Sequence, residues 1–452
     1  MREWLIRGLA VFICIILLIY TAYWGVNQMR LRIAKLTGRR VEEVKPPIPT
    51  IPIELVTYAA VLGFAAVGGF MAVSALRSRG RLFGVVKVED FQRHVLIFGP
   101  TGSGKTSTAL KAVENSLRKG IPVEILDWKG EYATKFRGAT VIRKVKLLEP
   151  PDWGNVQSHV LVVIDILRDV LDLSEPMSYM LYEELTKMYE QRSASFNVLL
   201  EQLKYRRATA LAQRFMAEAN IAEALIRRIL PLVLDEAREA ENLKGSDLVR
   251  IYDLSQLPTY QLKTLYAEII LWRLYNEALK AGGGSLSLRK LIIAEESQNY
   301  VRPRRPERQP SIGERIVNEL RAYGYGFTLI APDPNQLPYH MTRDAGAVIS
   351  IGYQGLPRVV AELLSYYRYA DIKRLLKTTN RPRTYIYYNG RLFIRGLPRP
   401  YKSTIDLGVE AVPERAVTEE VEERPMERPL VLEEEELEPS GGADHPRIRL
   451  ER

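Results

Sequence analysis

One stretch of the chain, residues 99–106, has the residue types and spacing to hold a phosphate chain. It fills every fixed position of the pattern G-x-x-x-x-G-K-[ST] with Gly99, Pro100, Thr101, Gly102, Ser103, Gly104, Lys105 and Thr106. Glycines let the backbone turn tightly, so that successive N–H groups point at phosphate oxygens. In such loops the lysine reaches the β- and γ-phosphates and the hydroxyl ligates Mg²⁺. We therefore expect residues 99–107, Ser107 included, to bind ATP with Mg²⁺, with Lys105 and Thr106 in those two roles.

A second group with chemical potential is the carboxylate pair Glu295 and Glu296. It directly follows the apolar run 291–294, which is typical of a buried strand. Such a pair is common at solvated strand ends, but downstream of a phosphate-binding loop it fits the magnesium and water positions. We expect Glu295 to hold hydrated Mg²⁺ opposite Thr106 and Glu296 to orient and polarise the attacking water.

Alternating strands and helices are expected to position these residues. Apolar runs predict strands at 94–98, 123–127, 160–165, 248–253, 291–294 and 327–330, and helical spacing predicts helices at 107–119 and 259–280. This alternation indicates an α/β fold with a parallel sheet and crossover connections. Residues 174–243 are almost continuously helical in pattern and predict an all-helical insertion, and residues 383–392 predict a terminal hairpin.

Charge is distributed unevenly along the 452 residues. The formal net charge is +10, yet residues 406–452 carry 15 acidic and 6 basic side chains, a net of −9 that leaves +19 on the rest. A basic body suits a polyanion or an anionic membrane surface, although a heat-adapted surface rich in Arg and Glu would look similar. Cys14 is the only cysteine, which excludes internal disulfides and cysteine-based metal sites.

Two uncharged runs near the amino terminus have the length of membrane spans. Residues 8–26 and 55–76 can each cross a bilayer core as a helix. A cleaved signal peptide is the rival interpretation of the first run, but no small-x-small cleavage site follows it cleanly. Six basic residues lie on each side, so the positive-inside rule is undecided. Because the triphosphate pool is cytoplasmic, we expect a multi-pass protein of the cell membrane with its nucleotide-binding domain in the cytoplasm.

These features divide the chain into four parts. We expect a membrane anchor at 1–80, an α/β domain at 81–173 and 244–400, the helical insertion at 174–243, and an acidic disordered tail at 401–452.

Three motifs in order give the chain a family resemblance. Residues 99–106, the segment 127–132 with Asp127, Lys129 and Glu131, and the segment 293–299 around Glu295 and Glu296 resemble the HerA/FtsK superfamily of DNA-translocating ATPases. The two spans ahead of such a domain resemble the membrane-anchored coupling proteins of conjugation and the membrane-bound ATPases of archaeal DNA import. The resemblance covers residues 85–400.

The resemblance implies a RecA/FtsK-like P-loop NTPase fold and a homohexameric ring, with nucleotide at each interface and DNA in the channel. It also implies that Arg321 acts as an arginine near the interface, where an ordinary helix-terminal arginine is the alternative interpretation. Where the family usually places a γ-phosphate-sensing glutamine, this chain has Pro332, and Asn335 or Gln336 is a possible substitute from the next turn.

Other candidates for nucleic-acid contact follow the acidic pair. Prolines keep residues 302–308 out of regular structure, and arginines there could contact phosphates in a channel: Arg302, Arg304, Arg305 and Arg308. A solvated surface loop explains the same segment. Tyr366, Tyr367 and Tyr369 could stack on bases, and helix packing explains them equally well.

Taken together, the sequence predicts a membrane-anchored ring ATPase that moves DNA across or at the membrane, with a separate pore protein as a possible partner. Two rival hypotheses remain. One is a secretion or pilus-assembly ATPase that acts on protein, and the other is a nucleotide-regulated membrane scaffold that hydrolyses little, suggested by Pro332.

Overall fold

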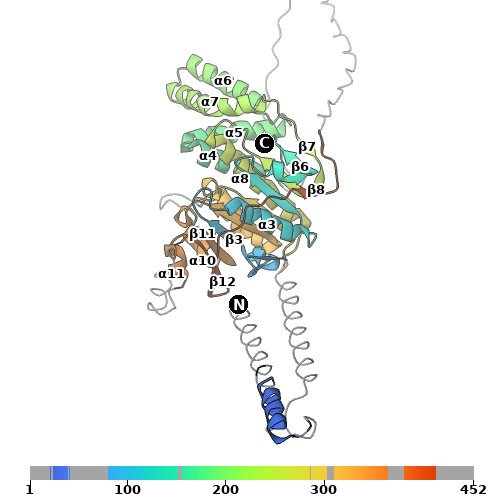
Figure 1. The fold of residues 1–452 in the computed structure, drawn as a ribbon. Coiled ribbons are helices and arrows are strands. Elements are labelled where there is room, and N and C mark those ends of the chain that lie inside the picture. Colours follow the sequence, from blue (N-terminus) through green and yellow to red (C-terminus); the bar gives the residue numbers. More distant parts are fainter. Residues whose placement is uncertain are drawn as a thin grey trace, which may run out of the picture. The chain divides into compact units, whose positions relative to one another are not determined.

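The computed structural model of the chain describes residues 21, 24–38, 40, 80–150, 155–285, 287–302, 310–364 and 381–413 (Figure 1). Residues 24–37 form a helix. The expected span at 55–76, and residues 8–20 of the first span, lie outside the described residues. Among the helices described, none combines the length and the apolar character that crossing a membrane requires.

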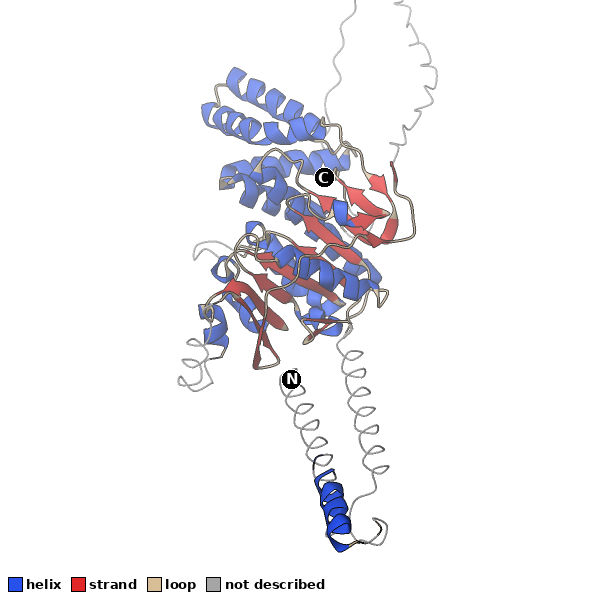
Figure 2. Ribbon diagram, viewed as in Figure 1, coloured by secondary structure: helices blue, strands red, loops and turns tan. Residues whose placement is uncertain are grey.

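The described domain is built on a sheet of eleven strands in the order β13-β12-β11-β3-β10-β9-β4-β8-β6-β7-β15 (Figure 2). Its central seven strands, β11 to β6, are parallel, and antiparallel strands extend both edges. The parallel strands are β3 (Val95–Phe98), β4 (Val123–Asp127), β6 (Ala139–Ile142), β8 (Ser246–Asp253), β9 (Lys290–Ala294), β10 (Tyr325–Ala331) and β11 (Ala347–Tyr353). The antiparallel ones are β7 (Leu243–Lys244), β12 (Arg383–Tyr388), β13 (Arg391–Arg395) and β15 (Val412–Pro413). The expected α/β fold with a parallel central sheet is confirmed.

Strand order brings the predicted motifs to one edge of the sheet. β10 lies between β3 and β9, with Ala331 opposite Phe98 and Leu329 opposite Ala294, and β4 is next, with Leu126 opposite Ala294. Because parallel strands share one direction, the segments that follow β3, β9 and β4 all emerge at the carboxyl edge. The phosphate loop, the two glutamates and the Asp127 segment therefore meet there.

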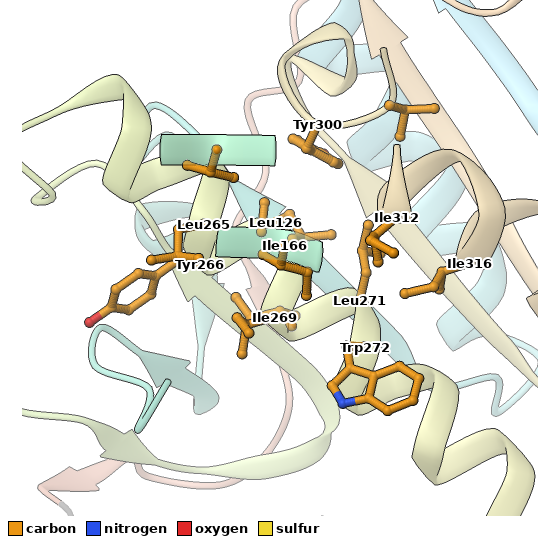
Figure 3. Close-up of a cluster of buried hydrophobic side chains, with 14 of the residues drawn as sticks. Leu126, Ile166, Leu265, Tyr266, Ile269, Leu271, Trp272, Tyr300, Ile312 and Ile316 are labelled. Carbon is orange, nitrogen blue, oxygen red and sulfur yellow. The ribbon is translucent and has the colours of Figure 1, made fainter. Parts of the chain in front are cut away.

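Successive residues of the central strands face opposite sides of the sheet and build two cores. In β3, Val95 and Ile97 belong to one buried cluster and Leu96 and Phe98 to the other. Helix α3 (Lys105–Leu117) packs on the first side. On the second side lie α8 (Tyr260–Ala281), α9 (Ile312–Leu320), α10 (Tyr339–Asp344) and α11 (Arg358–Leu363), and Figure 3 shows part of that core.

The helical insertion begins earlier than expected. Its helices are α4 (Val156–Leu171), α5 (Glu175–Glu190), α6 (Phe196–Ala212) and α7 (Met216–Glu236). The strand predicted at 160–165 is therefore wrong, because those residues lie within α4. The Asn155 side chain caps α4 by accepting from the Gln157 N–H, and the buried residues recur at helical spacing through Leu171. A short apolar run does not by itself distinguish a buried strand from a helix.

The start of the predicted disordered tail is also wrong. Residues 396–413, which we call the C-terminal strap, pack along the domain instead of leaving it. Within the strap, β14 (Ile405–Asp406) pairs with β5 (Phe136–Arg137), and β15 pairs with β7. Ile405 and Leu407 pack against the α3-side core, which explains why this segment is ordered despite its polar surroundings. The remainder of the predicted tail, from residue 414, lies outside the described residues.

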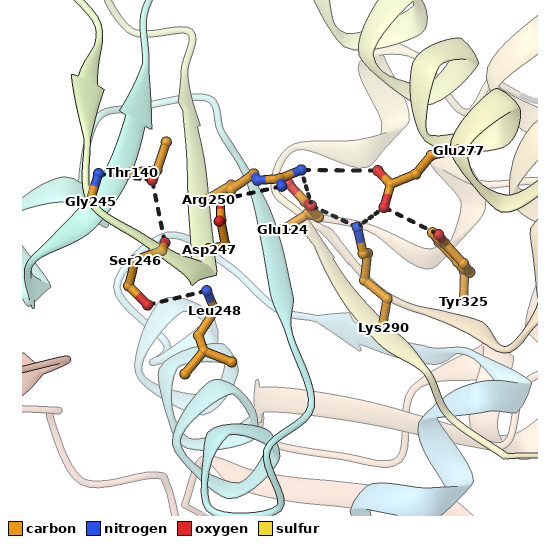
Figure 4. A network of polar contacts seen from close by, with 10 residues as sticks. All are labelled: Glu124, Thr140, Gly245, Ser246, Asp247, Leu248, Arg250, Glu277, Lys290 and Tyr325. Carbon is orange, nitrogen blue, oxygen red and sulfur yellow. Dashed lines mark hydrogen bonds and ion pairs between the residues drawn. The ribbon is translucent and has the colours of Figure 1, made fainter. Parts of the chain in front are cut away.

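A buried ion network lies at the opposite, amino edge of the sheet (Figure 4). Lys290 of β9 donates to Glu124 of β4 at 2.9 Å and to Glu277 of α8 at 2.6 Å. Arg250 of β8 approaches the same Glu124 carboxylate at 3.5 Å. Burial raises the pKa of Glu124, and the neighbouring cations oppose that rise. The network joins the three strands by side-chain contacts in addition to their backbone ladder.

Candidate nucleotide site

The phosphate loop connects β3 to α3 as its sequence predicts. Gly104 has φ 101°, a left-handed conformation that favours glycine, and Lys105 begins the helix. The Gly99 N–H donates to the Pro332 carbonyl at 3.3 Å, which ties the loop to the end of β10. The first turn of α3 thus presents its free N–H groups at the carboxyl edge, where they can bind an anion.

Lys105 lies over this loop. Its Nζ donates to the carbonyl oxygens of Gly99 at 2.7 Å and Pro100 at 3.1 Å. Burial lowers the pKa of the Lys105 ammonium, while the Glu296 carboxylate acts to raise it. The side chain is therefore placed at the mouth of the loop, where phosphate oxygens can replace the two carbonyls as its partners.

Thr106, in the first turn of α3, lies beside Glu295, which follows β9. The Thr106 hydroxyl donates to Glu295 Oε1 at 3.4 Å. Glu295 is 3 % exposed, and its Oε2 has no hydrogen-bond partner among the described residues. Burial, with the negative charges of Asp127 and Glu131, raises the pKa of Glu295 to about 8. A hydroxyl beside a buried carboxylate with an unpartnered oxygen suits Mg²⁺, which prefers oxygen ligands and would stabilise the ionised form.

Glu296 has a different environment from its neighbour. Its backbone adopts φ 46°, an uncommon value for a residue with a side chain. Lys129 Nζ lies 2.5 Å from its Oε1, and Gln298 Nε2 donates to its Oε2 at 2.6 Å. Burial works to raise the pKa of Glu296, but the contacts with Lys129 and Gln298 outweigh it and lower the pKa. Glu296 is therefore a carboxylate aimed at the site and restrained by a cation.

The predicted motif segment after β4 is a shaped loop that carries Lys129. Asp127 Oδ1 accepts from the N–H groups of Gly130 at 2.8 Å and Glu131 at 3.1 Å, and Oδ2 accepts from that of Tyr132 at 2.8 Å. Asp127 is thus a structural residue that fixes the loop. Lys129 reaches the site, and the Glu131 side chain is exposed beside it.

Comparison with known proteins agrees with this arrangement. Residues 82–274 match the family described as the central domain of the helicase HerA. The chain contains a HerA/FtsK-type P-loop ATPase domain. Glu295 and Glu296 lie beyond the matched segment and are placed in the site by the sheet order instead.

Two solved structures resemble this HerA/FtsK-type ATPase in fold. VirB4 of Thermoanaerobacter pseudethanolicus is 14% identical, covering 70% of this chain and 93% of its own, with a TM-score of 0.51. The bacterial conjugative coupling protein TrwBΔN70 is 10% identical, covering 70% of this chain and 86% of its own, also with a TM-score of 0.51. No curated protein sequence matches the chain significantly.

Two other predicted site residues of the ATPase lie at opposite edges of the sheet. Arg321 follows α9 directly and precedes β10, so it lies at the amino edge of the sheet, opposite the loop. There it stands near His94, whose pKa is lowered to about 4 by burial and then by the Arg321 charge. Gln336 is exposed in the short turn Pro334–Gln336 beyond β10, at the carboxyl edge.

The structure gives Arg302 a role within the domain. Its guanidinium pairs with Asp169 of α4 and with Glu268 of α8, the latter at 3.1 Å. These pairs join α4 and α8 to the loop after Glu296, and contact of Arg302 with nucleic acid stays a prediction. Residues 303–309 and 365–380, with the other candidate arginines and Tyr366, Tyr367 and Tyr369, lie outside the described residues.

Sequence reasoning missed the C-terminal strap as part of the site. A Cβ added to Gly104 would stand 2.5 Å from Pro398 Cγ, and the Tyr401 N–H donates to Ser107 Oγ at 3.2 Å. The strap therefore crosses the first turn of the phosphate-binding helix. Its only sequence signal was apolar residues such as Ile405 and Leu407 at the start of an otherwise acidic segment.

Proposed function

We propose that this ATPase hydrolyses ATP and uses the energy to move DNA at or across a membrane. The observation that carries the proposal is the assembly of Lys105, Thr106, Glu295 and Glu296 at one sheet edge, within a domain whose first part matches the HerA family. The fold is shared with a conjugative coupling protein, which supports a motor that handles a polymer.

In the proposed reaction, the loop N–H groups and Lys105 bind the β- and γ-phosphates. Mg²⁺, held by Thr106 and Glu295, would neutralise the charge that develops on the phosphates. Glu296 orients the attacking water and accepts its hydrogen bond. As the water oxygen bonds to the γ-phosphorus, the bond from that phosphorus to the β–γ bridging oxygen breaks, ADP leaves, and the water proton passes through Glu296 to the released phosphate. In this proposal Lys105 and Thr106 bind, and Glu296 orients the water and holds its proton. The contacts of Thr106 with Glu295 and of Lys129 with Glu296 support their common location at the carboxyl edge.

A closed ring is proposed because it would give Arg321 access to a phosphate site. Arg321 lies at the amino edge of its sheet, whereas the phosphate loop of the same chain lies at the carboxyl edge. A role for Arg321 at the γ-phosphate therefore requires a neighbouring subunit, as in a heterologous ring with nucleotide between subunits. We propose a homo-oligomer of this kind, a hexamer by resemblance to the HerA/FtsK superfamily.

DNA is the proposed polymer because of charge. Residues 1–405 carry a net +19, which suits contacts to a phosphate backbone without base reading. The apolar runs 8–26 and 55–76 support anchorage in the cell membrane with the ATPase domain in the cytoplasm.

ATP hydrolysis by the full chain in detergent, with and without DNA, tests the proposal, with Lys105→Ala as the inactive control. We expect DNA to raise the rate severalfold and heparin, a polyanion of different shape, to raise it less. A rate indifferent to DNA but raised by an unfolded protein would favour a protein-handling motor. Hydrolysis no faster than in the control, with nucleotide still bound, would favour the scaffold.

A further inference from the structure

We propose that Lys129 is a second phosphate-binding lysine that exchanges partners during the cycle. It holds Glu296 while the γ-phosphate position is empty, and it moves to the γ-phosphate when a triphosphate binds. The proposal rests on the proposed role of Glu296 in orienting water.

Glu296 is held by two side chains. Both carboxylate oxygens are engaged, Oε1 with Lys129 at 2.5 Å and Oε2 with Gln298 at 2.6 Å. Each oxygen keeps a second lone pair, but against the effect of burial the Lys129 ammonium lowers the pKa of Glu296 and so weakens the carboxylate as an acceptor for an attacking water. Loss of the Lys129 contact would therefore make Glu296 a stronger acceptor for that water.

Lys129 is the partner that can leave. Its backbone is fixed, because Asp127 accepts from three N–H groups of the same loop, but its side chain is 42 % exposed and has four rotatable bonds. Gln298 belongs to the short helix η4 (Ser297–Asn299), which begins immediately after the glutamates, only two residues from Glu296. The loop therefore keeps the Lys129 ammonium within reach of the site while leaving it free to change its contact.

The γ-phosphate of a bound triphosphate would compete with Glu296 for the Lys129 ammonium. Lys105 and Lys129 both lie close enough to Glu296 for its charge to act on each, so two ammonium groups have the same carboxylate as a neighbour. The γ-phosphate carries more negative charge than a carboxylate and offers three oxygens. When it enters between the two lysines, it attracts Lys129 away from Glu296 and frees Glu296 for water. A diphosphate ends short of that position and leaves the Lys129–Glu296 pair in place.

The difference in affinity between a triphosphate and a diphosphate tests this exchange. Binding of a non-hydrolysable ATP analogue and of ADP, each with Mg²⁺, is measured for the full chain in detergent. Variants are Lys129→Met, Lys129→Arg and, as a control on the same connection after β4, Lys135→Met. We expect Lys129→Met to weaken analogue binding about tenfold, the size typical of a lost charged hydrogen bond, with ADP binding unchanged. Lys129→Arg should restore much of the loss, and Lys135→Met should behave as wild type.

Three results would overturn the proposal. Equal weakening for both nucleotides means that Lys129 only shapes the loop. Unchanged binding of both means that it contacts no phosphate. Faster hydrolysis with unchanged analogue binding means that Lys129 restrains Glu296 without moving to the phosphate.

The proposed role of Glu296 in hydrolysis is tested by a separate variant. Glu296→Gln should abolish hydrolysis while nucleotide binding persists. If Glu296→Gln hydrolyses normally, the role of Glu296 is wrong, whereas the affinity ratio of the Lys129 variants still decides whether Lys129 contacts the γ-phosphate.

Discussion

Glu295 and Glu296 are neighbours in sequence, yet their environments move their pKa values in opposite directions. Burial and nearby negative charge raise the pKa of Glu295, whereas contacts with Lys129 and Gln298 lower that of Glu296. Pairs of carboxylates separated in this way commonly divide two roles between them. The sequence predicted the pair, and its division of roles stays a prediction. It did not predict the Lys129 contact, because that contact depends on β4 lying beside β9.

At the residue scale, Gly104 and Gly102 form a matched pair. Both have positive φ, but only a Cβ at Gly104 would meet another residue, Pro398 of the strap. We expect Gly104→Ala to lower the melting temperature more than Gly102→Ala and to weaken ATP binding, because the strap must shift. Adding Pro398→Ala to Gly104→Ala should recover part of the loss in melting temperature and in ATP binding. Equal melting temperatures for the two single variants would contradict the packing of the strap on the loop.

At the scale of elements, local pattern predicted β3, β4, β9, β10, α8 and the terminal hairpin close to their observed bounds. In each of these, buried apolar residues, caps and turn residues agree. Thr259, for example, caps α8 by accepting from the Leu262 N–H. Helix α4 and the strap were missed for a common reason. Their structure is decided by packing against distant segments, and the local sequence leaves strand, helix and coil open.

The buried ion network gives a prediction for the sheet. Lys290→Met should lower the free energy of unfolding by about 3 kcal/mol, because it leaves the Glu124 carboxylate buried without its nearest cation. The double variant Lys290→Met with Glu124→Leu should recover most of that loss, since both charges are then absent. Denaturant unfolding monitored by tryptophan fluorescence measures both. A double variant as unstable as the single one would mean that the network is needed for more than charge compensation.

The contact between α4, α8 and Arg302 predicts a pH dependence. Burial raises the pKa of Glu268 to about 8, although the Arg302 charge opposes this and Asp169 favours it. The folded protein then holds a proton that the unfolded chain releases near its ordinary pKa, so this stabilisation is complete at low pH and is lost as pH rises toward 8.

Glu268→Gln cannot titrate and should flatten that decline. Unfolding free energies of wild type and Glu268→Gln, measured from pH 5 to pH 8, should therefore diverge, with the variant gaining relative stability as pH rises. Parallel profiles for the two proteins would show that Glu268 is ionised throughout this range.

At the scale of the whole molecule, anchorage is the prediction that depends on sequence alone. The apolar runs 8–26 and 55–76 should keep the full chain in a membrane fraction that resists alkaline extraction. A chain beginning at residue 80 should be released into the soluble fraction with its nucleotide binding intact, because the phosphate loop and strap lie wholly within it. Extraction of the full chain by alkali would contradict the proposed spans.

Movement along DNA is the central claim, and displacement of a bound block tests it most directly. Streptavidin on either end of biotinylated single- and double-stranded DNA provides that block, with free biotin to trap what is released. We expect release that requires ATP, that favours one end and that fails with Glu296→Gln. Release equal for wild type and Glu296→Gln, or none despite DNA-stimulated hydrolysis, would contradict a DNA-translocating motor.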